Sequence, residues 1–216
     1  MNSKKIGIIG SGIVGQALAN GFVRHGHKVM LASREPAKLE DWRTGATASA
    51  STGTFAEAAR FGEVVVLAVM GEAAEEAVSL CGDALNGKVV LDATNPICKS
   101  APPEQGVLRL FTTLDSSLME RLQAKAPQAR FVKAFSSVAA GLMVNPKLPS
   151  KPSMFICGDD SAAKETARAI LDQFGWEAED MGRAAAARAI EPLCILYCIP
   201  GILKNDWTRA FKVLRA

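Results

Sequence analysis

The sequence predicts a doubly wound α/β fold with a parallel sheet, extended at the C-terminus by a small region of strands and helices. Three observations support this prediction. Apolar strand-like runs alternate with helical segments, the spacing Gly10-x-Gly12-x-x-Gly15 separates the first strand from the first helix, and residues 64–69 are apolar throughout, as in a strand covered on both faces. We expect the sheet to occupy residues 1–145, and residues 146–216 to pack on it and complete a cleft.

The glycine pattern indicates a dinucleotide site. Gly10 permits a tight turn after the strand, Gly12 lets the backbone approach a pyrophosphate, and Gly15 lets helix and strand pack closely. The helix that follows would direct its free N–H groups at the phosphates. We therefore predict that the pyrophosphate is held by Gly10, Ser11, Gly12, Ile13, Val14 and Gly15.

The end of the second strand, at residues 28–32, indicates which cofactor binds. An NAD enzyme usually carries Asp or Glu at this point, whereas here Ser33 and Arg34 offer a hydroxyl and a guanidinium suited to a 2′-phosphate. Lys38 is either a second cation on that phosphate or a solvated surface lysine. The sequence therefore favours NADP(H).

The remaining elements follow from turn and capping signals. Thr54 opens a capping box, so a helix should begin there and end near Gly62. Further strands are expected within residues 45–53 and at 88–92, 129–134, 153–157 and 176–179, and further helices at 39–42, 72–81, 118–126, 161–174 (capped by Ser161), 184–203 and 206–214.

The carboxyl ends of the strands should form the cleft, because ligands of open α/β sheets bind there. This places Val69, Met70, Asn95, Val138 and Ala140 beside the nicotinamide half of the cofactor. For Asn95, a simple Asn-Pro turn is an equally good interpretation.

No catalytic residue is predicted. His25 and His27 flank the far end of the first helix, Lys133 lies within a strand, where it would help the sheet edge or a phosphate, and Lys204 falls on the helical tail. Hydride transfer between a nicotinamide and a flavin-like ring needs little acid–base help from side chains. We therefore expect catalysis by positioning.

Composition narrows the class of protein. The chain is 49% hydrophobic with a net charge of +3, and its basic residues are scattered, so no nucleic acid partner is expected. Its 5 cysteines lack a disulfide or metal-ligand spacing, which favours reduced thiols in a cytoplasm and no metal. The apolar stretch 189–203 is short and contains Glu191 and two prolines, so no membrane span is expected.

The chain also resembles the deazaflavin (coenzyme F-420) dependent NADP reductase family. The motifs that carry the resemblance are the glycine pattern with Ser33-Arg34, Val132-Lys-Ala-Phe-Ser-Ser137, Ile156-Cys-Gly-Asp-Asp160 and Arg188-Ala-Ile-Glu-Pro-Leu193. The resemblance implies that Ser11, Ser33, Arg34 and Lys38 hold NADP, and that Val138 and Ala140 abut the nicotinamide with a second ring stacked beyond it. The family also includes the cytoplasmic ferric-reductase domains of membrane proteins. The loop 95–117 and the stretch 198–207 differ from the reductases, which leaves the acceptor open.

Together these observations predict an NADPH-dependent oxidoreductase that transfers hydride between NADP(H) and a flavin or deazaflavin. Reduction of a small imine or carbonyl compound is an alternative, although such enzymes usually add a longer helical domain. A non-catalytic NADP(H)-sensing protein is another. The partner is expected to be a small redox acceptor, and an apolar face on the last helix, with Trp207 and Phe211, would suit a homodimer.

Overall fold

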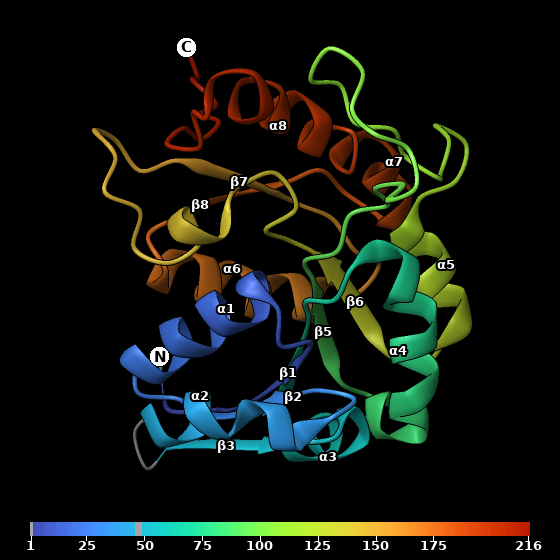
Figure 1. Cartoon of the computed structure of the whole chain (residues 1–216), viewed down its shortest axis with the longest axis vertical. Coiled ribbons are helices and arrows are strands. Elements are labelled where there is room, and N and C mark those ends of the chain that lie inside the picture. Colours follow the sequence, from blue (N-terminus) through green and yellow to red (C-terminus); the bar gives the residue numbers. More distant parts are fainter. Residues whose placement is uncertain (1, 46–48) are drawn as a thin grey trace.

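The computed structural model describes residues 2–45 and 49–216. Its centre is a six-stranded parallel sheet in the order β3-β2-β1-β4-β5-β6, the order of a dinucleotide-binding fold (Figure 1). The predicted fold class is therefore confirmed. The strands are β1 (Lys5–Ile9), β2 (Lys28–Ala32), β3 (Ala50–Gly53), β4 (Val64–Leu67), β5 (Val89–Asp92) and β6 (Arg130–Lys133).

Helices cover both faces of this sheet. Side chains of α1 and α6 enter the core on one face, and those of α3, α4 and α5 enter the core on the other. Along β4, Val64 and Val66 point into the first core and Val65 and Leu67 into the second, which explains the unbroken apolar run. The helices are α1 (Ile13–Arg24), α2 (Glu40–Gly45), α3 (Phe55–Phe61), α4 (Ala74–Cys81), α5 (Leu118–Lys125) and α6 (Ser161–Gln173), with the 3₁₀ helices η1 (Pro36–Leu39), η2 (Gly71–Ala73), η3 (Gly82–Leu85) and η4 (Ala140–Leu142).

Side-chain caps fix where three of these helices begin. The capping box predicted at Thr54 is present at the start of α3. A second box, which was not predicted, opens α5: Glu120 N–H donates to Ser117 Oγ over 3.1 Å and Ser117 N–H donates to Glu120 Oε2 over 2.9 Å. The cap of α6 is Asp160 and not Ser161, because Asp160 Oδ1 accepts the N–H of Ala163.

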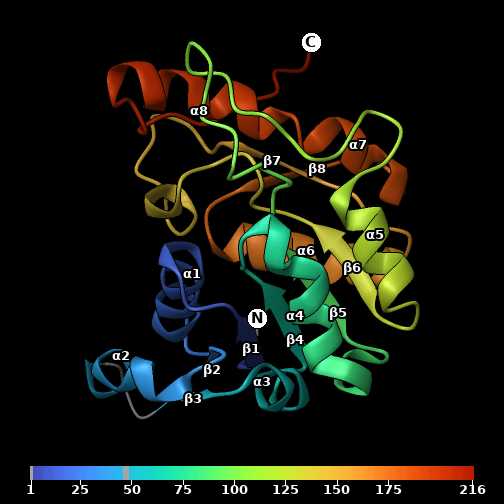
Figure 2. The same cartoon turned by 45° about the vertical axis from the view of Figure 1, so that its right-hand side comes forward.

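The C-terminal region forms a separate layer beside the large sheet. Strands β7 (Ser153–Ile156) and β8 (Glu177–Asp180) pair in parallel, and the N–H of Lys133 donates to the carbonyl of Cys157 over 3.0 Å, which links this pair to β6. The helical stretch η5 (Ala184–Ala186), α7 (Ala187–Ile190) and α8 (Leu193–Lys204) then crosses the molecule beside the green loop after β5 (Figures 1 and 2). Leu203 packs against Gly106 of that loop.

The prediction of a helix at residues 206–214 is wrong, because this segment has no regular secondary structure. Asn205 adopts a left-handed conformation, with φ of 53°, which ends α8. The tail then follows β7: Phe211 accepts a hydrogen bond from the N–H of Ser153, whose hydroxyl accepts one from Val213. Leu214, which the helical spacing placed on the apolar face, is 85% exposed.

Within the described residues, one helical stretch is apolar and long enough to cross a bilayer by length and composition. It runs from Ala184 to Lys204, 21 residues that contain an 18-residue window with a mean hydropathy of 1.5, and is thus longer than the sequence pattern suggested. In this fold a third of that stretch is buried, and Glu191 within it is 1% exposed.

Candidate functional site

A cleft of about 470 Å³ opens at the carboxyl ends of β1, β2 and β4. It brings together nine of the residues predicted to bind the cofactor: Gly10, Ser11, Gly12, Ile13, Val14, Ser33, Arg34, Val69 and Met70. Its remaining lining comes mainly from α3 and α4 and includes Phe55, Ala73, Glu76, Ala77 and Leu80. Ile13 and Met70 are 82% and 59% exposed, so two large apolar side chains stand at the opening.

The three glycines have three different surroundings. Gly10 has φ of 113°, a conformation that disfavours any side chain. A Cβ on Gly15 would lie 1.9 Å from the carbonyl oxygen of Gly10, so only glycine allows α1 to pack this closely on the turn. A Cβ on Gly12 would meet no atom within 4 Å. Space beside Gly12 and unpaired N–H groups in the first turn of α1 are what a bound pyrophosphate requires.

Ser33 and Arg34 follow β2 at the edge of the cleft. The N–H of Ser33 donates to Gly53 over 3.1 Å, which anchors the turn to β3, and Ser33 Oγ accepts the N–H of Glu35. Lys38 is not among the lining residues of the cleft; its ammonium lies 2.8 Å from Glu35, and both side chains are largely exposed. The hydrogen bond and charge of Lys38 lower the pKa of Glu35.

Asn95 joins the loops that follow β5 and β6. Its Nδ2 donates to the carbonyl of Ser136 over 2.8 Å, and its own carbonyl packs so closely on Gly71 that a Cβ there would lie 2.0 Å away. Asn95 Oδ1 and Ser136 Oγ are both buried without a hydrogen-bond partner among the described residues. Val138 is 8% exposed and Ala140 opens η4; neither lines the cleft beside Gly12, and their place at the nicotinamide stays a prediction.

Lys133 is neither a surface residue of the sheet edge nor available to a phosphate. It is fully buried, and its ammonium lies 2.6 Å from Asp92 Oδ2 and 2.8 Å from Glu191 Oε1, with the carbonyl of Thr94 accepting at 3.0 Å. Burial by itself would lower the pKa of Lys133, but the carboxylates of Asp92 and Glu191 outweigh it and raise the pKa. The lysine is therefore a buried cation, and the expected role at a phosphate is wrong.

No histidine or cysteine is among the residues that line the cleft. His27 is buried; its Nδ1 accepts the N–H of Lys4, which leaves Nε2 to donate to Gln173. Burial raises the pKa of Cys81 and of Cys157 to about 12, so both are thiols at neutral pH. The described residues contain no group of three His, Cys, Asp or Glu side chains placed to hold a metal ion.

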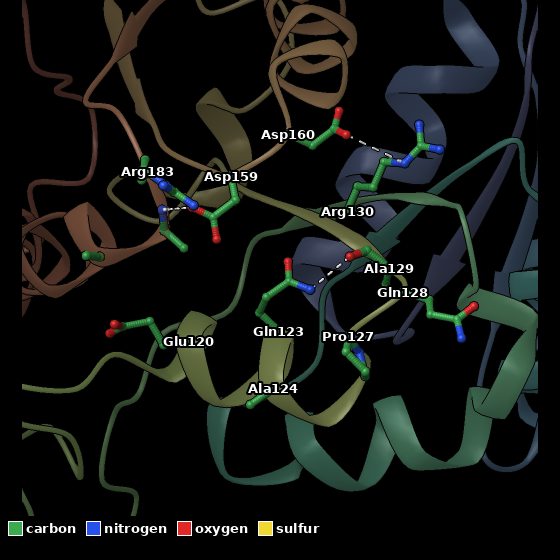
Figure 3. A pocket seen from close by; sticks show the side chains of 12 residues that line it. Glu120, Gln123, Ala124, Pro127, Gln128, Ala129, Arg130, Asp159, Asp160 and Arg183 are labelled. Atoms are coloured by element: carbon green, nitrogen blue, oxygen red, sulfur yellow. Dashed lines mark hydrogen bonds and ion pairs between the residues drawn. The ribbon is translucent and has the colours of Figure 1, made fainter.

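A second, polar cavity of about 760 Å³ lies beside α5, near the start of β6 and of α6 (Figure 3). Its charges already pair with one another. Arg183 Nε lies 3.0 Å from Asp159, and Arg130 Nε lies 3.8 Å from Asp160. Because Arg130 begins β6, this cavity lies at the end of the strands opposite the glycine-lined cleft.

Comparison with known proteins gives relatives along the whole chain. Residues 5–96 match the family described as NADP oxidoreductase coenzyme F420-dependent. The chain is 26% identical to the F420-dependent NADP reductase of Methanocaldococcus jannaschii over 200 residues, which cover 88% of each protein. It is 31% identical to the metalloreductase STEAP3 of Rattus norvegicus over 190 residues, but spans only 36% of that protein's length. A crystal structure of a putative F420-dependent NADP-reductase from Arthrobacter sp. FB24 superimposes with a TM-score of 0.91 at 28% identity, covering 99% of this chain and 100% of that one.

Proposed function

We propose that this chain transfers hydride between NADP(H) and a flavin or deazaflavin, because its residues 5–96 match the family described as NADP oxidoreductase coenzyme F420-dependent. The single observation that carries this proposal is the cleft itself. It combines the open space beside Gly12 with Arg34 at the end of β2, one site for a pyrophosphate and one for a 2′-phosphate.

The residues of the cleft fit this cofactor. Glycine-rich backbone at the start of α1 would hold the pyrophosphate, and Ser33 and Arg34 the 2′-phosphate. When bound, the nicotinamide would supply or accept the hydride. The segments at Met70, Asn95 and Val138 would orient its ring and exclude water.

The residues that line the cleft, together with Asn95, Val138 and Ala140 that are predicted beside the nicotinamide, include no histidine or lysine to move a proton. This favours a second ring over an alcohol or carbonyl substrate. Reduction of a simple carbonyl needs a positioned acid, whereas a flavin-like ring carries its own acid–base groups. Catalysis would then rest on alignment of the two rings.

Anaerobic oxidation of NADPH tests this proposal. The acceptors are FMN, FAD, riboflavin and coenzyme F420, each with NADH in parallel. Saturable turnover with one acceptor, and a marked preference for NADPH, is the expected result. Tight NADPH binding without turnover of any acceptor would contradict it and favour an NADP(H)-sensing protein.

The homodimer and the cytoplasmic location remain predictions. The helix at residues 206–214 that suggested a dimer surface is not formed, but Leu196 and Leu203 on α8 are each 57% exposed and provide an apolar surface in its place.

A further inference from the structure

Lys133, Asp92 and Glu191 form a buried ionic cluster that neither the sequence nor the cleft accounts for. We propose that this cluster is a positioning device for the nicotinamide end of the cofactor: it fixes residues 92–95 so that Asn95 is held against Ser136. The inference rests on the proposed function, since it assumes that NADP(H) occupies the cleft.

Three oxygens surround the ammonium of Lys133. It donates a hydrogen bond to the carbonyl of Thr94 over 3.0 Å and forms ion pairs with Asp92 at 2.6 Å and Glu191 at 2.8 Å. Lys133, on the neighbouring strand β6, therefore fixes the backbone directly before Asn95.

Asp92 binds the same segment through hydrogen bonds to Thr94. Its Oδ1 accepts the N–H of Thr94 over 2.9 Å and the hydroxyl of Thr94 over 2.6 Å, while Oδ2 makes the ion pair with Lys133. The backbone N–H and C=O of Thr94 are thus both bound within the cluster. Asn95 then has a defined starting point for its hydrogen bond to the carbonyl of Ser136.

Two buried polar atoms beside this segment have no hydrogen-bond partner among the described residues: Oδ1 of Asn95, which ends the segment, and Oγ of Ser136, whose carbonyl accepts the hydrogen bond from Asn95. Such atoms are unfavourable unless a ligand or water completes them. An amide oxygen that accepts and a hydroxyl that donates are complementary to the NH₂ and C=O of a carboxamide, which is the polar group of nicotinamide. These atoms are the second observation that points from the cluster to the ligand.

Glu191 brings the C-terminal region into the cluster. Its two oxygens accept the N–H groups of Leu118 and Met119 over 2.9 and 3.0 Å, at the start of α5, where a helix favours negative charge. Stability alone does not explain this arrangement, because well-packed apolar residues often replace buried ion pairs without loss. A requirement for a fixed backbone position at Thr94 does explain it.

Two ligands separate the positioning role from a merely structural one. NADP⁺ uses both halves of the cleft, whereas adenosine 2′,5′-bisphosphate carries only the adenine half. We would measure both by titration calorimetry on the full chain, with thermal unfolding alongside, for Lys133→Met/Asp92→Asn, which removes the ion pair as a unit. Thr94→Val removes one hydrogen bond and leaves the charges and volume, so it serves if the double variant fails to fold. Lys151→Met is the matched control, because Lys151 pairs with Asp172 on the surface.

We expect NADP⁺ to bind the double variant at least about tenfold more weakly than the unaltered protein, and Thr94→Val to show a smaller loss of NADP⁺ affinity. The affinity for the bisphosphate should stay within about twofold of that of the unaltered protein. The control should leave both affinities unchanged. Equal losses for the two ligands, or no loss for either in a folded variant, would overturn the positioning role and leave the proposed function intact. If neither ligand binds the unaltered protein, the cofactor assignment fails first and this inference with it.

Discussion

At the scale of single residues, Arg34 is predicted to decide between NADP(H) and NAD(H). It lies at the edge of the cleft, and a charge-assisted hydrogen bond contributes about 1.5 to 3 kcal/mol. We expect Arg34→Ala to weaken NADPH roughly 10- to 150-fold and to change NADH little. Fluorescence titration of both cofactors measures this, with Arg168→Ala as the control, because Arg168 pairs with Glu165 on α6 and does not line the cleft. Equal losses of NADPH and NADH affinity would contradict the assignment.

Gly12 and Gly15 should respond differently to the same added methyl group. Gly12→Ala has room in the free protein, so the melting temperature should stay the same while NADPH affinity falls because the methyl group meets the pyrophosphate. Gly15→Ala would place a Cβ 1.9 Å from a backbone oxygen, so the protein itself should be destabilised by about 1 to 3 kcal/mol. Thermal unfolding with and without NADPH distinguishes the two. A stable Gly12→Ala protein with unchanged affinity would show that the phosphates lie elsewhere.

The ion pair of Glu120 and Arg188 predicts a pH dependence. Hydrogen bonds from Arg188, and those from Ser117, lower the pKa of Glu120 from 4.5 to about 2 against the effect of burial. Because the pKa is lowered on folding, the stabilisation is fully present above pH 4.5 and is lost as the pH falls towards 2.

Glu120→Gln isolates this charge, since glutamine also serves in a capping box. Arg188 is 40% exposed, so solvent screening reduces the effect, and we expect the variant to be less stable by about 1 to 2 kcal/mol at neutral pH. Urea unfolding at a series of pH values should show this difference shrink below pH 4.5. A difference independent of pH would exclude the ion pair as its source.

At the scale of elements, the junction of α8 with the tail depends on Gly201, which has no side chain. A Cβ on Gly201 would lie 2.4 Å from ring carbons of Trp207, whose carbonyl accepts the hydroxyl of Tyr197 over 2.9 Å. Gly201→Ala should therefore displace Trp207, loosen the tail and destabilise the protein by about 1 to 3 kcal/mol. Limited proteolysis and thermal unfolding measure both effects. Gly45→Ala, where a Cβ meets nothing within 4 Å, is the control; comparable cleavage of both variants would mean that Trp207 does not anchor the tail.

Helices and strands were predicted correctly where their structure depends on residues close in sequence. The capping box at Thr54 and the apolar run of β4 depend on neighbours in sequence, and both are confirmed. The tail was mispredicted because Trp207, Phe211 and Leu214 have helical spacing, whereas its hydrogen bonds go to Ser153 on β7. Periodicity carries no information about such a distant partner.

At the scale of the whole molecule, the two sheets share the core on the α1 and α6 face of the large sheet. Trp176 and Phe174 of the C-terminal region pack with Phe22 and Val132 of the large sheet's layer, and Trp176 is 1% exposed. We therefore expect a single cooperative unfolding transition, with tryptophan fluorescence and far-UV circular dichroism giving the same midpoint. Two separate midpoints would show that residues 146–216 unfold independently.

The candidate site shows the same division between local and distant information. The glycine pattern and Ser33-Arg34 form one continuous supersecondary unit, so their positions around the cleft were predictable from spacing. The partners of Lys133 were not. Asp92 and Glu191 lie far from it in the chain, and nothing near Lys133 in sequence indicates that a lysine in this strand has two buried carboxylates.

The cluster at Lys133 also means that the half of this protein that contains the large sheet depends on a residue of the C-terminal region. All six strands of the large sheet are complete by Lys133, so a shortened chain that ends before Glu191 would retain the whole sheet and its glycine turn. It would nevertheless lack one of the two counter-charges of a fully buried ammonium, and the acceptor for the first N–H groups of α5. A chimaera that contains this half would also have to include Glu191, or another carboxylate in its place.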